Sequence, residues 1–325
     1  MSKGKSVKAG TNSKRLRMQI LVIVVVILYY VICNFVTGGK LFDPDNIRVI
    51  LTSVSFPLIV SLGMVFVFSG GIVDLSIGAQ IILAANVGAI FVENFGMGYP
   101  GLIIGAIVTI IICQVASAAC SVFLGIPSWV AGLGAALVFE AIAAIIIKAS
   151  TDGTAVVYME SCKEIGSFPS IFIVAIVIAI VAWIIFNRTK LGFNLRAIGG
   201  GGEVAEAMGI NKKKTIILAC IVGAIIVGFG AIVQVSYSGS FKPSAGMGSL
   251  TEIFKPLAIL MISGSFARIF NDIVGCIVGS FIVAGLFNVL TMLGVTGGTG
   301  QDICLGIVVL VCGIFSSLGY KGVVK

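Results

Sequence analysis

Few side chains in this chain have the types and spacing that chemistry on a substrate requires. The chain has no histidine, which excludes a histidine-ligated metal site and a histidine general base. Its eight cysteines show neither a CxxC pair nor the spacing of metal ligands. Only Cys162 falls in a clear loop, so we interpret the cysteines as small packing residues. We therefore expect no catalytic residue and no metal.

A nucleotide-binding loop is also missing. The GK[ST] tripeptide at Gly4-Lys5-Ser6 has no room before it for the first glycine of GxxxxGK[ST]. We expect no cofactor in this chain, and we expect any ATP and Mg that it depends on to be bound by another chain.

Two carboxylates interrupt apolar sequence and are the strongest candidates for a binding role. Residues 70–78 read GGIVDLSIG, which places Gly70, Gly71, Asp74 and Ser76 between two apolar runs. A carboxylate at membrane depth is costly unless it is paired, capped or hydrated, so a broken helix beside a solute pathway is one interpretation. An ordinary turn, with Asp74 or Ser76 capping the next helix, is the other.

Glu140 follows Phe139 inside another apolar run and is the second such carboxylate. It either faces a pathway or lies near a helix end and reaches water. Trp129 is placed at a helix boundary, where it either anchors the helix at the membrane interface or faces a solute. The candidate pathway residues are Gly70, Gly71, Asp74, Ser76, Trp129 and Glu140.

The elements that must position these residues are membrane spans. Hydrophobic residues make up 58% of the 325 residues and charged residues only 10%, whereas soluble domains carry about 25% charged residues. Long non-alternating apolar stretches predict an all-α polytopic membrane protein rather than a β-barrel. We expect about ten transmembrane helices, over 18–36, 48–68, 72–92, 101–124, 129–148, 168–187, 215–236, 253–267, 273–293 and 302–319. The eighth is short and contains Pro256, which suggests a broken or partly re-entrant helix.

The charged residues predict the orientation of these spans. The net charge of +8 is gathered in a basic N-terminal segment and in a central polar segment, which favours the positive-inside bias over nucleic-acid binding. With both termini in the cytoplasm, 15 of the 21 Lys and Arg residues fall on the cytoplasmic side. The predicted organisation is a cytoplasmic basic tail at 1–17, one transmembrane domain at 18–320 containing a cytoplasmic segment at 188–214, and a cytoplasmic tail at 321–325.

The central segment carries its own signals. After a run of four glycines, residues 203–208 can form a short helix, with Glu203 at its start and Gly209 at its end. A short helix held at the membrane surface by two long spans is suited to docking a partner, although a plain charged loop gives the same pattern.

Three stretches resemble the permease subunits of ATP-binding-cassette importers for ribose, xylose, galactose and related monosaccharides, to which nucleoside importer permeases are related. Residues 70–78 resemble the family's GGIDLSVG, and residues 126–134, IPSWVAGLG, resemble its IPxFIxTLG. Residues 189–210, TKLGFNLRAIGGGGEVAEAMGI, resemble its TxFGRxxxAIGGNxxAAxxxGI. The resemblance covers about residues 47–320 and implies that the third stretch contacts the ATPase. The implied coupling residues are Gly199, Gly200, Glu203, Ala205, Met208, Gly209 and Ile210.

The chain also departs from that pattern. Val73 is an insertion in the first motif, Gly201 replaces an asparagine in the third, and the family's late glycine-rich stretch is reduced to residues 263–275. These differences suggest a divergent branch.

The resemblance implies a permease for a small polar solute, chiefly a monosaccharide, in the bacterial plasma membrane. Its implied partners are an ABC ATPase subunit, an extracytoplasmic solute-binding protein and a second permease copy or a similar permease. The alternatives are a nucleoside importer permease, an ion-gradient-driven secondary transporter that uses Asp74 and Glu140, and a scaffold or channel subunit without pumping.

Overall fold

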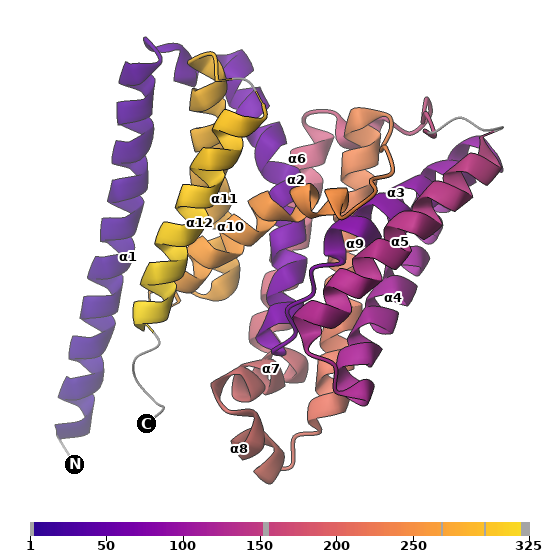
Figure 1. Cartoon of the computed structure of the whole chain (residues 1–325). Helices are drawn as coiled ribbons and strands as arrows, with labels where there is room; N and C mark the ends of the chain where they lie inside the picture. Colours follow the sequence, from indigo (N-terminus) through magenta and orange to yellow (C-terminus); the bar gives the residue numbers. More distant parts are fainter. Residues whose placement is uncertain (1–2, 152–155, 268, 296, 320–325) are drawn as a thin grey trace.

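The computed structural model describes residues 3–151, 156–267, 269–295 and 297–319. Ten helices of 15 or more residues account for most of this part of the chain (Figure 1). They are α1 (Lys3–Val36), α2 (Pro44–Ser69), α3 (Ile77–Glu93), α4 (Gly98–Leu124), α5 (Ser128–Ser150), α6 (Ser170–Arg188), α9 (Lys212–Ser238), α10 (Thr251–Ser265), α11 (Asp272–Met292) and α12 (Thr299–Gly319).

Each of the ten predicted spans coincides with one of these helices, which confirms the all-α polytopic prediction. Within the described residues, seven helices are long and apolar enough to cross a membrane: α1 over Leu16–Val36, α2, α4, α5, α6, α9 and α11. The shorter α3 and α12 are apolar as well. The helix α10 is only 15 residues long and contains Pro256, as the sequence led us to expect.

Short elements connect the long helices. Between α6 and α9 lie α7 (Lys190–Gly200) and α8 (Gly202–Ala207), and single 3-10 turns occupy Lys40–Phe42 (η1), Glu164–Gly166 (η2) and Gly248–Leu250 (η3). The helices α7 and α8 lie at the same end of the molecule as the start of α1 and the end of α12 (Figure 1). We call this the α7–α8 end. This common end agrees with the predicted placement of both termini and residues 188–214 on one side.

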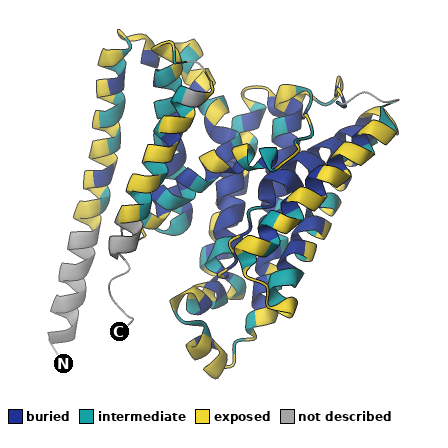
Figure 2. Cartoon of the chain, in the orientation of Figure 1, coloured by how far each residue is buried: buried dark blue, intermediate teal, exposed yellow. Residues whose placement is uncertain are grey.

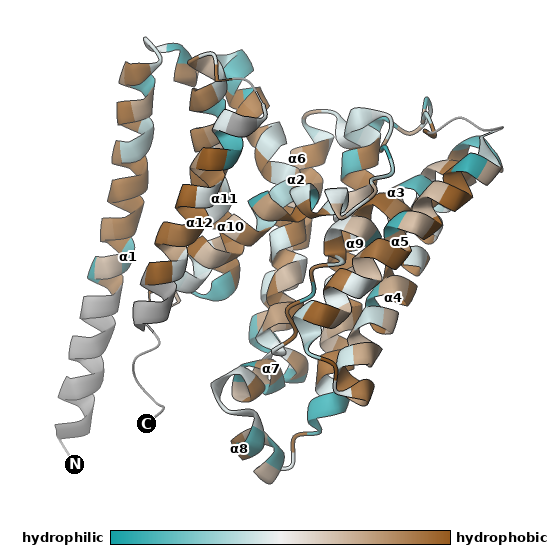
Figure 3. Ribbon diagram, viewed as in Figure 1, coloured by the Kyte–Doolittle hydropathy of each residue, from teal (hydrophilic) through white to brown (hydrophobic). Residues whose placement is uncertain are grey.

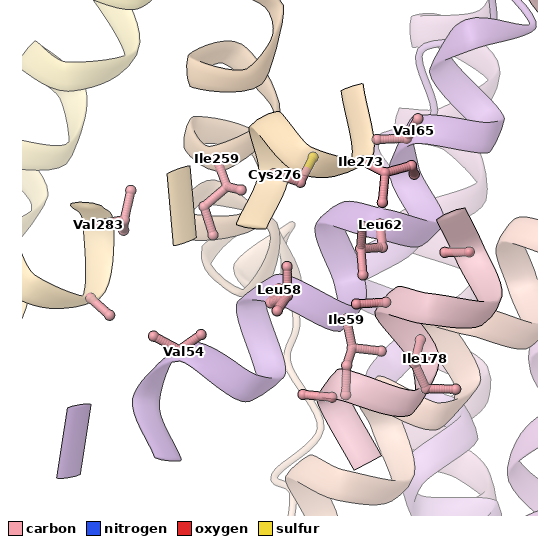
Figure 4. Close-up of a cluster of buried hydrophobic side chains, with 14 of the residues drawn as sticks. Val54, Leu58, Ile59, Leu62, Val65, Ile178, Ile259, Ile273, Cys276 and Val283 are labelled. Carbon is pink, nitrogen blue, oxygen red and sulfur yellow. The ribbon is translucent and has the colours of Figure 1, made fainter. Parts of the chain in front are cut away.

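The helix α2 runs through the centre of the bundle. It packs against α9 on one side and against α6, α10 and α11 on the other. A cluster of buried aliphatic side chains, including Leu58, Ile59, Ile178 and Ile273, fills the space between α2, α6 and α11 (Figure 4). Burial of such side chains is the main favourable contribution to packing of water-soluble segments, whereas within lipid close van der Waals contact takes that role.

Glycines bring several helices into close contact. The small-residue pair Gly101 and Gly105 on α4 packs against α3, because a Cβ at Gly105 would lie 3.1 Å from the Cα of Gly88. The pair Gly275 and Gly279 on α11 packs against α10, where a Cβ at Gly279 would lie 3.2 Å from the carbonyl of Ile259. Small residues at these positions therefore allow the close helix approach that membrane bundles favour.

The outer faces of the bundle are apolar. The helices α1, α5 and α12 expose long faces (Figure 2), and these faces are largely hydrophobic (Figure 3). The helix α1 contacts the remaining bundle mainly at α11, where the Tyr30 hydroxyl donates to the carbonyl of Phe281 over 2.7 Å. Exposed apolar faces combined with helical backbone are the arrangement that a lipid environment requires.

Two irregular segments enter the bundle. After α2, residues 70–76 run from the α7–α8 end back into the bundle before α3 begins (Figure 1). After α9, residues 239–250 lead to η3 and α10. The segments meet where Gly78, at the start of α3, lies against the backbone of Ser249.

Candidate functional site

A polar cavity of about 420 Å³ lies between α2, α9, α10 and α11. Its lining comes from residues 49–57 of α2, the first half of α10, residues 280–291 of α11, the last turns of α9 and the first turn of α12. These parts of α2, α9, α11 and α12 lie toward the end of the bundle opposite α7 and α8 (Figure 1). Polar and apolar side chains share the wall, and the polar ones include Ser53, Gln234, Glu252, Lys255, Asn288 and Gln301. Cavities of this size suit small ligands.

The charged side chains of this cavity come from α10. Glu252 and Lys255 are three residues apart and therefore lie on the same face of the helix. The Lys255 ammonium lies 4.4 Å from the centroid of the Phe287 ring, which also lines the cavity. In the part of the chain that the structure describes, the ion pair with atoms within 4 Å is formed by Arg48 and Asp45. Glu252 and Lys255 do not form an ion pair at this distance.

An asparagine pair joins α2 to α11 beside the cavity. The amide of Asn46 donates to Asn288 Oδ1 over 3.1 Å, and the amide of Asn288 donates back to Asn46 Oδ1 over 2.9 Å. Asn46 also donates to the carbonyl of Leu41. These contacts hold the ends of two cavity-lining helices together at the opposite end of the bundle.

The Asp74 carboxylate is completely buried, and both of its oxygens accept hydrogen bonds from the protein. Its Oδ1 accepts the backbone N–H of Ser76 over 2.8 Å and the Ser76 hydroxyl over 2.7 Å. Its Oδ2 accepts the Gln114 amide over 2.9 Å and the Gln80 amide over 3.4 Å. Through its bonds to Gln80 of α3 and Gln114 of α4, Asp74 connects the start of α3 to α4. The Ser76 N–H lies just before α3, and the N-cap Ser76 makes no side-chain capping bond, so Asp74 closes the turn before the helix and neither Asp74 nor Ser76 caps α3 as the sequence suggested.

The Glu140 carboxylate is buried in the middle of α5. Its two oxygens accept the backbone N–H groups of Met247 and Ser249 over 3.0 and 2.8 Å. The first N–H groups of a helix have no partner within the helix, and an acidic side chain near them is favourable. Glu140 therefore holds η3, and with it the start of α10, from a neighbouring helix.

The three remaining predicted pathway residues lie elsewhere. Gly70 and Gly71 line a second pocket of about 510 Å³, bounded by the start of α9 and by α7 and α8, which we call the α7–α8 pocket. Trp129, at the start of α5, is exposed. The structure therefore does not place the six predicted pathway residues around one cavity, and none of them lines the polar cavity.

The central segment 188–214 forms the predicted short helix. It appears as α8, preceded by the separate helix α7, and Gly209 follows it with φ of +86°. The side chains of Val204 on α8 and of Met208, which directly follows α8, are exposed, and so is that of Phe193 on α7. Ala205 is buried and fixes α8 to the bundle. Exposed apolar side chains among charged ones are typical of a surface that binds a protein partner.

A chain of polar contacts links α7 to α11. Arg196 of α7 donates to the Asn187 side-chain oxygen at the end of α6 over 3.3 Å. The same oxygen accepts the amide of Asn271, whose own oxygen caps Ile273 at the start of α11. Since α11 lines the polar cavity, these contacts connect the α7–α8 end of the bundle with the cavity wall.

Sequence reasoning missed Glu252, Lys255, Phe193 and Val204. A usable signal existed for the first two, because Lys255 falls inside the predicted span 253–267 and Glu252 directly precedes it. Charged residues inside a span are functional candidates by the argument applied to Glu140. The i,i+4 spacing of Val204 and Met208 was the signal for an apolar face on the short helix.

Comparison with known proteins gives a consistent class. Residues 46–313 match the family described as branched-chain amino acid transport system / permease component. The galactose/methyl galactoside import permease protein of Haemophilus influenzae is 25% identical over 296 residues, covering 85% of this chain and 87% of that protein. The ribose import permease protein of Escherichia coli is 25% identical and covers 85% of each chain. The D-allose transport system permease protein of E. coli is 28% identical and covers 76% of each.

One solved structure shares the fold. A chain of PsaBC from Streptococcus pneumoniae in complex with Fab superposes with a TM-score of 0.50 at 16% identity, covering 89% of this chain and 95% of that chain. The similarity supports the observed helical arrangement.

Proposed function

The chain belongs to the branched-chain amino acid transport system / permease component family, and from this premise we propose that it is the membrane-spanning permease subunit of an ATP-binding-cassette importer for a monosaccharide. The similar galactose, ribose and D-allose permeases support the sugar as the solute class. A hydroxyl-rich solute also suits a cavity whose polar wall is built from amide, hydroxyl and charged side chains.

The observation that carries the proposal is the placement of two features at opposite ends of the bundle. The polar cavity lies in the half of the bundle away from α7 and α8, where a solute can be received. The exposed apolar side chains of α7 and α8 lie at the other end, where a partner can be bound (Figure 1). A permease driven by a separate ATPase needs both features and needs them on opposite sides of the membrane.

In this proposal the polar cavity faces outward, and an extracytoplasmic binding protein delivers the solute to it. An ABC ATPase, which binds ATP and Mg, docks on α7 and α8 in the cytoplasm. Its motion passes through Arg196, Asn187 and Asn271 to α11, so that the cavity closes outward and opens inward. A second permease copy or a similar permease completes the pathway. The protein is a multi-pass plasma membrane protein, in a bacterium, with both termini cytoplasmic.

Uptake by the source cells tests this function. Deletion of the chain should abolish ATP-dependent uptake of at least one of labelled D-galactose, D-ribose and D-allose. Collapse of the proton gradient with ATP maintained should leave that uptake intact. Unchanged uptake of all three sugars in the deletion strain would exclude them as solutes. Loss of uptake on collapse of the proton gradient, with ATP still maintained, would indicate a secondary transporter.

A further inference from the structure

The polar cavity is lined by two charged groups, Glu252 and Lys255, whose nearest opposite charges act only beyond ion-pair distance: each acts on the other, and Asp302 acts on Lys255. Glu252 and Lys255 belong to α10, where Glu252 is partly buried and Lys255 is exposed. In the part of the chain that the structure describes, neither side chain forms an ion pair within 4 Å or a side-chain hydrogen bond, and Lys255 rests against the Phe287 ring. Both groups face the cavity.

The other two carboxylates discussed above behave differently. Asp74 receives four hydrogen bonds from Ser76, Gln80 and Gln114. Glu140 receives two backbone N–H groups. Their acceptor capacity is used to hold the fold, whereas the acceptor oxygens of Glu252 remain available to a ligand.

We propose that Glu252 and Lys255 contact the transported solute directly and select for solutes that are rich in hydroxyl groups and carry no net charge. This inference rests on the proposed function and adds the residues and the charge class. A hydroxyl group both donates and accepts, so a polyol can donate to the Glu252 carboxylate and accept from the Lys255 ammonium. An anion attracted by the Lys255 ammonium is repelled by the Glu252 carboxylate one helical turn away. A cation attracted by Glu252 is likewise repelled by Lys255.

The surrounding groups fit the same ligand. The uncharged amides of Gln234, Asn288 and Gln301 also line the cavity, although Asn288 is already paired with Asn46 and the Gln301 amide already donates to Thr291 and to the carbonyl of Val295. Pro57 and Pro256 have no N–H, so the α-helical ladder supplies no donor to the carbonyls of Ser53 and Glu252, which both line the cavity. The wall therefore offers many neutral hydrogen-bonding groups around one carboxylate and one ammonium.

Glu140 positions this pair. Its carboxylate fixes Met247 and Ser249 immediately before α10, and Glu252 is only three residues beyond Ser249. In this proposal Glu140, which the sequence suggested as a pathway residue, does not contact the solute. It acts by positioning α10, the helix that carries Glu252 and Lys255.

Two measurements test the inference. The first is the initial rate of uptake of labelled D-galactose, D-ribose and D-allose by cells that carry Glu252→Gln or Lys255→Met at normal membrane abundance. Each variant should transport the sugar about tenfold more slowly or worse, since a charge-assisted hydrogen bond is lost. Glu252→Asp should recover part of the rate, and the matched surface variants Glu160→Gln and Lys148→Met should transport normally.

The second measurement reads binding without transport and remains informative if a variant cannot support uptake. In a Cys162→Ser background, Ser53→Cys places a thiol in the cavity wall, and its reaction with a membrane-impermeant thiol reagent is followed in membranes. D-galactose, D-ribose or D-allose should slow this reaction, whereas D-galacturonate and D-galactosamine should not. Glu252→Gln should allow protection by the anion D-galacturonate, and Lys255→Met should allow protection by the cation D-galactosamine.

The outcomes separate the two claims. If deletion of the chain leaves uptake of all three sugars unchanged, the proposed solute class is wrong and this inference fails with it. If deletion abolishes uptake while both variants transport and protect as the wild type does, the permease assignment stands and the role of Glu252 and Lys255 is refuted. If none of the three sugars slows the reaction of the Ser53→Cys thiol in the otherwise wild-type cavity, the role of Glu252 and Lys255 is also refuted.

Discussion

The Glu140 carboxylate on α5 accepts the backbone N–H of Ser249 over 2.8 Å, although the two residues are 109 positions apart in sequence. With the second bond, from Met247, this contact fixes the irregular segment before α10 in the interior of the bundle. The buried position of the Glu140 carboxylate is thus explained by backbone N–H groups on a neighbouring segment that have no partner within their own helix. The contact also determines where Glu252 and Lys255 lie.

Replacement of Glu140 tests this role. Glu140→Gln substitutes an amide donor for one of the two acceptors and should destabilise the folded protein by about 2 kcal/mol. The expected readout is a lower melting temperature of the detergent-purified protein, together with slower uptake. Glu160→Gln, in an exposed loop, is the matched control. Unchanged stability with abolished uptake would instead assign Glu140 a direct contact with the solute.

The close approach of Gly78 to Ser249 gives a second prediction. A Cβ at Gly78 would collide with the Ser249 carbonyl, so Gly78→Ala should force α3 and η3 apart. Overpacking of this kind costs about 1–3 kcal/mol, and we expect reduced membrane abundance and a lower melting temperature. Gly134→Ala on α5 is the control, because a Cβ there meets no atom within 4 Å. Equal effects of the two substitutions would contradict the packing described here.

Asp74 is expected to be sensitive for a related reason. In Asp74→Asn an amide group faces donors from Ser76 and from the side chains of Gln80 and Gln114, so at least one hydrogen bond becomes a donor–donor contact. A cost of about 1–3 kcal/mol follows, measurable as loss of folded protein in detergent. Normal abundance and normal transport by this variant would show that neither a structural nor a pathway role depends on the carboxylate charge.

The sequence predicted the helices well and the sites only in part. Hydropathy and length located all ten helices, and the glycine run with Glu203 and Gly209 located α8, because these features depend on local sequence. The polar cavity depends on which faces of α2, α9, α10 and α11 meet, and no local pattern specifies that. Asp74 and Glu140 were recognised as unusual, but their partners Gln114 and Ser249 are 40 and 109 residues away.

The side of the membrane occupied by each loop can be measured at Cys162. Burial first, and then the neighbouring carboxylates of Glu93 and Glu164, raise the pKa of the Cys162 thiol. Less thiolate is therefore present at neutral pH than for an ordinary cysteine, and labelling by an impermeant maleimide should be slow and should accelerate at alkaline pH. Glu164→Gln should lower the pKa and speed labelling at neutral pH.

Topology follows from where labelling occurs. Cys162 should react in intact cells, because it lies on the predicted outer side. A cysteine introduced by Glu203→Cys in a Cys162→Ser background should react only after the cells are permeabilised. The reverse pattern would invert the proposed orientation and place the polar cavity on the cytoplasmic side.

The coupling segment gives a further prediction. Glu203→Lys combined with Gly209→Val changes the charge at the start of α8 and places a β-branched residue at a φ of +86°, which such residues avoid. Because both positions are exposed, membrane abundance should be preserved while ATP hydrolysis is uncoupled from uptake. Normal uptake by this double variant would contradict the assignment of residues 199–210 as the coupling segment.

The most direct test of the account is purification of the tagged chain from native membranes in mild detergent, with co-purifying proteins identified by mass spectrometry. The account predicts recovery of an ABC ATPase with the wild-type chain, and its loss with a Val204→Glu, Met208→Glu variant that remains folded and retains normal membrane abundance. Recovery of a folded, monodisperse wild-type chain without an ATPase would contradict the proposed importer and favour a transporter that works alone.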